Sequence, residues 1–108
     1  MQAGYGRPHF FLAFHVALSY IRYVHRIEYS KSALKSLRRM PQNMAEIIRR
    51  KIAELARDPY ARNTNATKLQ GRKGYRLRVG DWRVLYEIDG VRVVILIVDI
   101  KPRGGAYQ

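Results

Sequence analysis

The spacing of hydrophobic and polar residues changes along this chain, and each spacing predicts a different element. Strict alternation in residues 25–29, HRIEY, predicts a short first strand. Apolar residues at helical spacing then predict two helices, residues 31–40 behind the N-cap residue Ser30 and residues 43–57, separated by Pro41. Their apolar stripes comprise Ala33, Leu34, Leu37 and Met40 in the first helix, and Met44, Ile47, Ile48, Ile52, Leu55 and Ala56 in the second. We expect the two helices to form a hairpin that lies on a sheet.

A second alternating region follows a polar, basic connection over residues 60–74. The stretch GYRLRVGDWRVLYEIDG, residues 74–90, reads as a β-hairpin with Gly80-Asp81 as its two-residue turn. This turn predicts the pairs Tyr75 with Tyr86, Leu77 with Val84, Arg78 with Arg83 and Val79 with Trp82. Because side chains alternate between the two faces of a strand, Arg76, Arg78 and Arg83 are expected on one face and the aromatic and branched residues on the other.

The last apolar run, VRVVILIVDI at residues 91–100, follows the turn signal Asp89-Gly90 and predicts a strand buried on both faces. Glu87 would then face Arg92 across that turn. The order of elements predicts a two-layer α+β fold, with an N-terminal strand, a helical hairpin and a three-stranded antiparallel meander. Residues 25–108 are expected to form this one domain.

Residues 1–24 are expected to be an N-terminal extension of that domain. The apolar run in residues 10–24 contains His15 and Arg22 and is shorter than a bilayer-spanning helix, so we do not expect a membrane segment. Three explanations stay open: a sequence added upstream of a complete domain, an extra packed element, or a targeting segment.

The net charge of the chain indicates what kind of molecule it binds. The 108-residue chain carries 21 Lys and Arg against 8 Asp and Glu, a formal net charge of +13, and it has no cysteine. Disulfides, thiolate metal sites and cysteine nucleophiles are therefore excluded. A charge this far from neutral predicts a polyanionic partner such as nucleic acid.

The arginine face of the hairpin is the candidate site. Arg76, Arg78 and Arg83 are joined, beyond the last strand, by Arg103 and Tyr107. Arginine forks fit phosphate oxygens and can stabilise the charge of a five-coordinate phosphoryl transition state without a metal, while a tyrosine can stack on a base. The alternative is that the arginines are ordinary solvated surface charge. Further phosphate contacts are expected from Lys68, Arg72 and Lys73. No metal or cofactor motif occurs, and the acidic residues are scattered singly.

Residues 25–108 resemble the RelE toxins of bacterial toxin–antitoxin systems. The resemblance rests on KLQGRKGYRLRVGDWRVLYEID, on IEYSKSALKSLRRMP before it, and on a terminal R-x-x-x-Y. It implies a metal-independent endoribonuclease of the cytoplasm that cuts messenger RNA in the ribosomal A site by attack of a 2′-hydroxyl on the adjacent phosphate, and so inhibits translation. It also implies an acidic antitoxin partner, and contact with operator DNA only through the toxin–antitoxin complex.

The resemblance also implies a role for each residue of the site. Arg76 and Arg78 would bind the message and take part in proton transfer, and Arg83 would contact the scissile phosphate. Arg103 would stabilise charge or protonate the leaving group, and Tyr107 would stack on a message base. The general base is left open, because arginine holds its proton too firmly for that role.

Two other functions stay open. The tail KPRGGAY lacks the charged residues that many RelE toxins have before the tyrosine, which leaves a non-catalytic protein that binds nucleic acid or an antitoxin as one alternative. The other is inhibition of DNA gyrase, as in ParE toxins.

Overall fold

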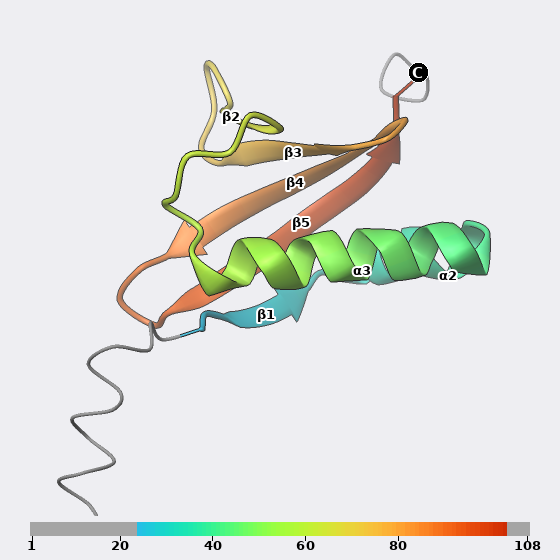
Figure 1. Cartoon of the computed structure of the whole chain (residues 1–108), viewed down its shortest axis with the longest axis horizontal. Coiled ribbons are helices and arrows are strands. Elements are labelled where there is room, and N and C mark those ends of the chain that lie inside the picture. Colours follow the sequence, from blue (N-terminus) through green and yellow to red (C-terminus); the bar gives the residue numbers. More distant parts are fainter. Residues whose placement is uncertain (1–23, 104–108) are drawn as a thin grey trace, which may run out of the picture.

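The computed structural model describes residues 24–103, which form a five-stranded sheet and two helices (Figure 1). The elements are β1 (Arg26–Tyr29), α2 (Lys31–Arg39), α3 (Gln42–Arg57), β2 (Ala66–Lys68), β3 (Tyr75–Val79), β4 (Trp82–Asp89) and β5 (Val94–Pro102). The strand order is β1-β5-β4-β3-β2. Both helices lie on one side of the sheet, as Figure 1 shows. The predicted two-layer α+β fold is confirmed.

The helical hairpin begins and turns where the sequence predicts. The hydroxyl of Ser30 accepts a hydrogen bond from the backbone N–H of Ala33 at 3.0 Å, which satisfies one of the free donors of the first turn of α2. Met40 caps the end of α2, and Pro41 precedes α3, where its missing N–H costs nothing.

The sheet contains one strand more than predicted. Residues 66–68 form β2, which pairs antiparallel with β3, so Lys68, predicted to lie in the polar connection of residues 60–74, lies on a strand opposite Tyr75. β1 runs parallel to β5, and the other neighbours are antiparallel. The predicted hairpin register holds at all four pairs, from Tyr75 opposite Tyr86 to Val79 opposite Trp82.

The core lies between the helices and one face of the sheet. Its fully buried side chains include Ile48 and Ile52 from α3, Val84 and Tyr86 from β4, and Ile95, Ile97 and Ile100 from β5. Two residues of the predicted stripes lie outside it, since Leu34 and Ile47 are 37% and 38% exposed.

Two expectations about the end of the sheet are wrong. The last strand begins at Val94 and not at Val91, and its outward side chains Leu96 and Val98 are only half-buried because both helices cover the other face. Glu87 lies opposite Leu96 and forms an ion pair with Lys73, at 3.8 Å. Arg92 pairs with Glu28 and Asp89 instead.

No helix within residues 24–103 is long and apolar enough to cross a membrane.

Candidate nucleic-acid interface

The sheet face away from the helices carries a cluster of basic side chains from three strands. This basic cluster consists of Arg76 and Arg78 on β3, Arg83 on β4 and Lys101 on β5, and Arg103 follows directly after β5. Arg83 lies opposite Arg78 on one side and opposite Lys101 on the other, so three cations form a row across three strands. The backbone N–H of Arg103 donates to the carbonyl of Asp81 at 2.6 Å, which holds the end of the sheet together at this point.

The arginines of the cluster have no acidic partners within the described part of the chain. Arg76, Arg78 and Arg83 form no ion pair with any of its carboxylates, and Arg83 Nε is buried without a hydrogen-bond partner there. Arg76, Arg83 and Lys101 line a small pocket of about 180 Å³ that has Leu69 and Leu85 as apolar walls. A buried, unsatisfied donor is costly unless it finds an acceptor. An anion bound here would supply one.

Lys101 is a member of this site that the sequence prediction missed. The predicted strand ended at Ile100, whereas β5 continues to Pro102 and sets Lys101 opposite Arg83. Its ammonium lies 3.7 Å from the carboxylate of Asp99. Asp99 is fixed in turn, because its other oxygen accepts hydrogen bonds from the hydroxyl of Ser32 and from the backbone N–H of Ile100, both at 2.9 Å.

Three further basic residues named from the sequence lie together, but not in the basic cluster. Lys68, Arg72 and Lys73 line a separate pocket of about 360 Å³ at the other end of β3, beside Tyr75 and Glu87. The ion pair of Lys73 with Glu87 lowers the net charge of this pocket. Arg72 and Lys68 are exposed and available for contact with a phosphate backbone.

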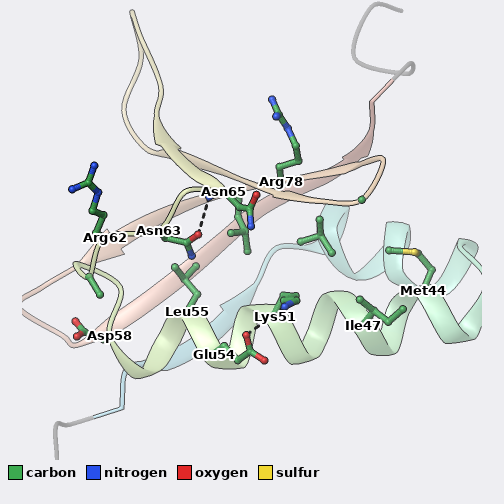
Figure 2. Close-up of a pocket in the computed structure, with 14 residues that line it drawn as sticks. Met44, Ile47, Lys51, Glu54, Leu55, Asp58, Arg62, Asn63, Asn65 and Arg78 are labelled. Carbon is green, nitrogen blue, oxygen red and sulfur yellow. Dashed lines mark hydrogen bonds and ion pairs between the residues drawn. The ribbon is translucent and has the colours of Figure 1, made fainter.

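A groove of about 720 Å³ runs between α3 and β3 (Figure 2). Its buried apolar walls come from Leu55 on α3 and from Leu77 and Val79 on β3. Ile47 is exposed along it, and the ion pair of Lys51 with Glu54 lies on its α3 side. The loop after α3 lines the opposite side with Arg62, Asn63 and Asn65. A groove with apolar walls and a polar rim fits an amphipathic segment of another protein.

Arg78 connects the groove with the basic cluster. It lines the groove, and Figure 2 shows its side chain directed away from α3. A segment bound along the groove would therefore end next to the arginine row.

The aromatic pair of the hairpin belongs to the core side, as predicted. The rings of Tyr75 and Tyr86 stack with centroids 5.4 Å apart. Burial, with a smaller contribution from neighbouring Tyr75, raises the pKa of Tyr86 to about 12. Trp82 is half-buried and packs against the core. These rings stabilise the scaffold on which the arginines are arranged.

One predicted site residue and most of the predicted N-terminal extension lie beyond the described residues. Tyr107 and the N-terminal extension, apart from Val24, fall outside the range 24–103. Within that range no group of three or more His, Asp or Glu side chains is placed to hold a metal ion.

Comparison with known proteins identifies one family of toxins. The model of the family described as "ParE toxin of type II toxin-antitoxin system, parDE" matches residues 27–107. A search of curated proteins gave no significant match.

Solved structures agree with that family. The archaeal RelE of the RelE-RelB complex from Pyrococcus horikoshii is 30% identical, with a TM-score of 0.65, over 76% of this chain and 98% of that one. The isolated Escherichia coli RelE toxin is 21% identical, with a TM-score of 0.62, over 72% and 83%. The YoeB/ParE toxin from Agrobacterium tumefaciens is 18% identical, with a TM-score of 0.61, over 71% and 96%. The last two show a common fold.

Proposed function

This chain belongs to the ParE toxin family of type II toxin–antitoxin systems, within the RelE/ParE superfamily, and we propose that it acts as a ribosome-dependent endoribonuclease that cuts messenger RNA in the ribosomal A site. The proposal rests on the environment of Arg83. Its buried Nε has no hydrogen-bond partner among the described residues, and its side chain lies between Arg78 and Lys101 in the row of cations. A toxin that only docked on a protein would not need this row, whose mutual repulsion destabilises the sheet.

The reaction that fits the site is transfer of the scissile phosphate to the neighbouring 2′-hydroxyl. The 2′-oxygen attacks the phosphorus, the bond to the 5′-oxygen breaks, and a 2′,3′-cyclic phosphate and a free 5′-hydroxyl are formed. The five-coordinate transition state carries an additional negative charge, which guanidinium forks stabilise. Arg83 would contact the scissile phosphate, and Arg76 and Arg78 would hold the message alongside.

The other predicted residues would bind or orient the RNA. Arg103 would stabilise developing charge at the end of the cluster, and Tyr107 would stack on a message base. Lys68, Arg72 and Lys73 would contact the phosphate backbone of ribosomal RNA. A toxin with this target works in the cytoplasm, where the ribosomes are.

The partner of such a toxin would be an acidic antitoxin. The P. horikoshii relative is described in complex with RelB, and the groove between α3 and β3 offers a surface to a segment of a partner of that kind. A net charge of +13 favours an acidic chain. Contact with operator DNA would occur through the complex of the two proteins.

Message cleavage in a translating cell-free reaction tests the proposal. The wild-type protein, Arg83→Ala and the control Arg50→Ala are compared, with cuts mapped by primer extension. Arg50 is an exposed arginine of α3, whereas the basic cluster lies on the sheet face away from the helices. We expect A-site cuts with wild type and with the control, and a loss of about 10²- to 10³-fold in Arg83→Ala. An intact message with folded wild-type protein would overturn the nuclease proposal.

A second candidate is inhibition of DNA gyrase, which the match to the ParE family model favours. Supercoiling of plasmid DNA by gyrase, measured with the same three proteins, separates the two candidates. Inhibition of supercoiling together with an intact message would support gyrase as the target.

A further inference from the structure

The groove between α3 and β3 keeps apolar side chains at the protein surface. Ile47 is 38% exposed along it, and Met44 follows on the same side of α3 (Figure 2). The walls beneath them come from Leu55, Leu77 and Val79, which are buried. Apolar side chains gathered at a concave surface indicate contact with a further segment of chain.

The chain enters the described part of the structure at one end of this groove. The backbone N–H of His25 donates to the carbonyl of Ala56, near the end of α3, at 2.9 Å. The ring of His25 also meets the ring of Tyr60 edge-on, with the ring centroids 6.0 Å apart. Ala61, the next residue after Tyr60, lines the groove. The residues that precede Val24 therefore start close to this end of the groove.

Residues 10–23 have the composition and the length of a segment that covers such a surface. They include 11 apolar or aromatic residues among 14, and none is acidic. The groove follows α3 from Met44 to Asp58, a distance of about 21 Å along a helix axis. A chain of this length spans about 21 Å as a helix and about 46 Å when extended, so residues 10–23 can reach along the whole groove.

The charge of the segment fits the end of the groove nearest to His25. Arg22 is the only lysine or arginine among residues 10–23, and it stands shortly before His25 in the chain. The carboxylates of Glu54 and Asp58 line this end of the groove. An arginine placed here meets opposite charge, while the apolar residues before it continue along the apolar walls.

We propose that residues 10–23 bind within their own molecule along the groove between α3 and β3, with their apolar side chains against Ile47, Leu77 and Val79. Of the three explanations left open for residues 1–24, this one is the extra packed element. The proposal does not depend on whether the toxin acts on messenger RNA or on gyrase. A partner that uses the same groove has to displace residues 10–23, whose effective concentration is on the order of millimolar because they are tethered. The segment thus weakens the binding of an antitoxin to this surface.

Photo-crosslinking of the full chain tests the proposal. The chain has no cysteine, so a single introduced cysteine carries a benzophenone label at a chosen position. Ile47→Cys and Lys51→Cys place the label in the groove, and Leu34→Cys, 37% exposed on α2, is the matched control outside it. Trypsin cuts after Arg22, so an adduct with the peptide that ends there is identified by its mass. An equal mixture of ordinary and ¹⁵N-labelled protein shows whether both parts of an adduct come from one molecule.

We expect adducts between the peptide that ends at Arg22 and both groove labels, at least about tenfold more abundant than adducts from Leu34→Cys, and all within one molecule. Two groove positions are used so that a label that itself blocks the groove at one position does not decide the result. Ile47 and Lys51 are both exposed, so their variants are expected to fold, and their melting temperatures check this.

Three results would overturn the proposal. Adducts that join an ordinary chain to a ¹⁵N-labelled chain would show that a second copy, and not the same molecule, occupies the groove. Equal adducts from Leu34→Cys would show that the segment contacts the surface without preference. The absence of adducts at both groove positions would leave the groove to another protein.

Discussion

Arg78 and Arg83 lie directly opposite each other on β3 and β4, in the centre of the basic cluster. Like charges at opposite positions of a strand pair destabilise it, and no carboxylate of the described residues pairs with either side chain. The hairpin keeps its register because Leu77, Val79 and Val84 are buried on the other face. The free energy of that burial offsets the repulsion, and the arginines are left free to bind an anion.

Removing one of these charges should therefore stabilise the free protein. We expect Arg78→Gln to raise the free energy of unfolding by about 0.2–1 kcal/mol at low salt, and the gain to shrink in 1 M salt as the repulsion is screened. Arg72→Gln is the matched control, since it removes the same charge from an exposed residue that has no cross-strand partner. Urea unfolding at two salt concentrations measures both variants. Equal effects of the two substitutions would show that only net charge matters.

The position of Arg78 opposite Arg83 could be predicted because a two-residue turn fixes the hairpin register. Gly80 has φ of +57° and is the only residue of the Gly80-Asp81 pair with a positive φ, which fits the first central position of a type II′ turn. With the turn set, alternation assigns every side chain of β3 and β4 to a face. The two helices could also be predicted, because Ser30 marks the start of the first, Pro41 separates them, and their apolar residues have helical spacing.

What the sequence did not reveal depends on longer loops and on tertiary pairing. The β4–β5 connection extends to Val93, which has φ of +58°, and the carboxylate of Asp89 accepts a hydrogen bond from the N–H of Arg92 within it. This longer turn sets Glu87 opposite Leu96 and so moves it away from Arg92. A register shift further along, between Leu85 and Tyr86, sets Lys101 opposite Arg83. β2 has only three residues and no apolar alternation, so pairing with β3 defines it. Lys101 was missed because its place in the site depends on that same register.

The groove leads to a prediction about neutralisation. In cells where an antitoxin neutralises the wild-type protein, we expect Ile47→Asp to restore toxicity, because a carboxylate would disrupt the apolar surface and repel an acidic partner. The loss of affinity should be at least about tenfold. Growth on co-expression and calorimetric titration measure it. Unchanged neutralisation would show that the antitoxin binds elsewhere.

Substitution of two neighbouring isoleucines of α3 should lower the free energy of unfolding by different amounts, because one is buried and the other is partly exposed. Ile48 is fully buried, whereas Ile47 is 38% exposed along the groove. Ile48→Ala is expected to cost about 2–5 kcal/mol, since it leaves a cavity between α3 and the sheet, and Ile47→Ala less than about 1 kcal/mol. Thermal or urea unfolding compares them. Similar losses would contradict the arrangement of α3 on the sheet.

Two glycines with positive φ should respond differently to a methyl group. A Cβ on Gly74, at φ of +110°, would lie 2.8 Å from the carbonyl oxygen of Tyr86, whereas one on Gly71, at φ of +74°, would meet nothing within 4 Å. Gly71→Ala should therefore cost only the backbone strain, about 1–2 kcal/mol. Gly74→Ala should cost more, because the backbone of β4 would have to move. Unfolding midpoints test this order, and a reversed order would contradict the close approach of Gly74 to β4.

Tyr86 should make the protein sensitive to alkali. Its pKa is raised from 10.0 to about 12 in the folded protein, mainly because burial disfavours the phenolate. Between these two pH values the unfolded chain binds fewer protons at this residue than the folded one, so stability falls as the pH rises. The contribution is fully present below pH 10 and is lost as the pH rises through about 12. A shift of this size corresponds to a loss on the order of 2–3 kcal/mol.

Tyr86→Phe removes the ionising group and keeps a ring to stack on Tyr75. We expect the variant to change little at pH 8, and to become more stable than wild type as the pH rises above 10, because it has no buried hydroxyl to ionise. Urea unfolding from pH 8 to pH 11.5 gives the difference in free energy directly, and the tyrosines that do not contact Tyr86 contribute equally to both proteins. If the two stability curves stay parallel over this range, the hydroxyl of Tyr86 ionises as readily in the folded protein as in water, and its burial is not what disfavours the phenolate.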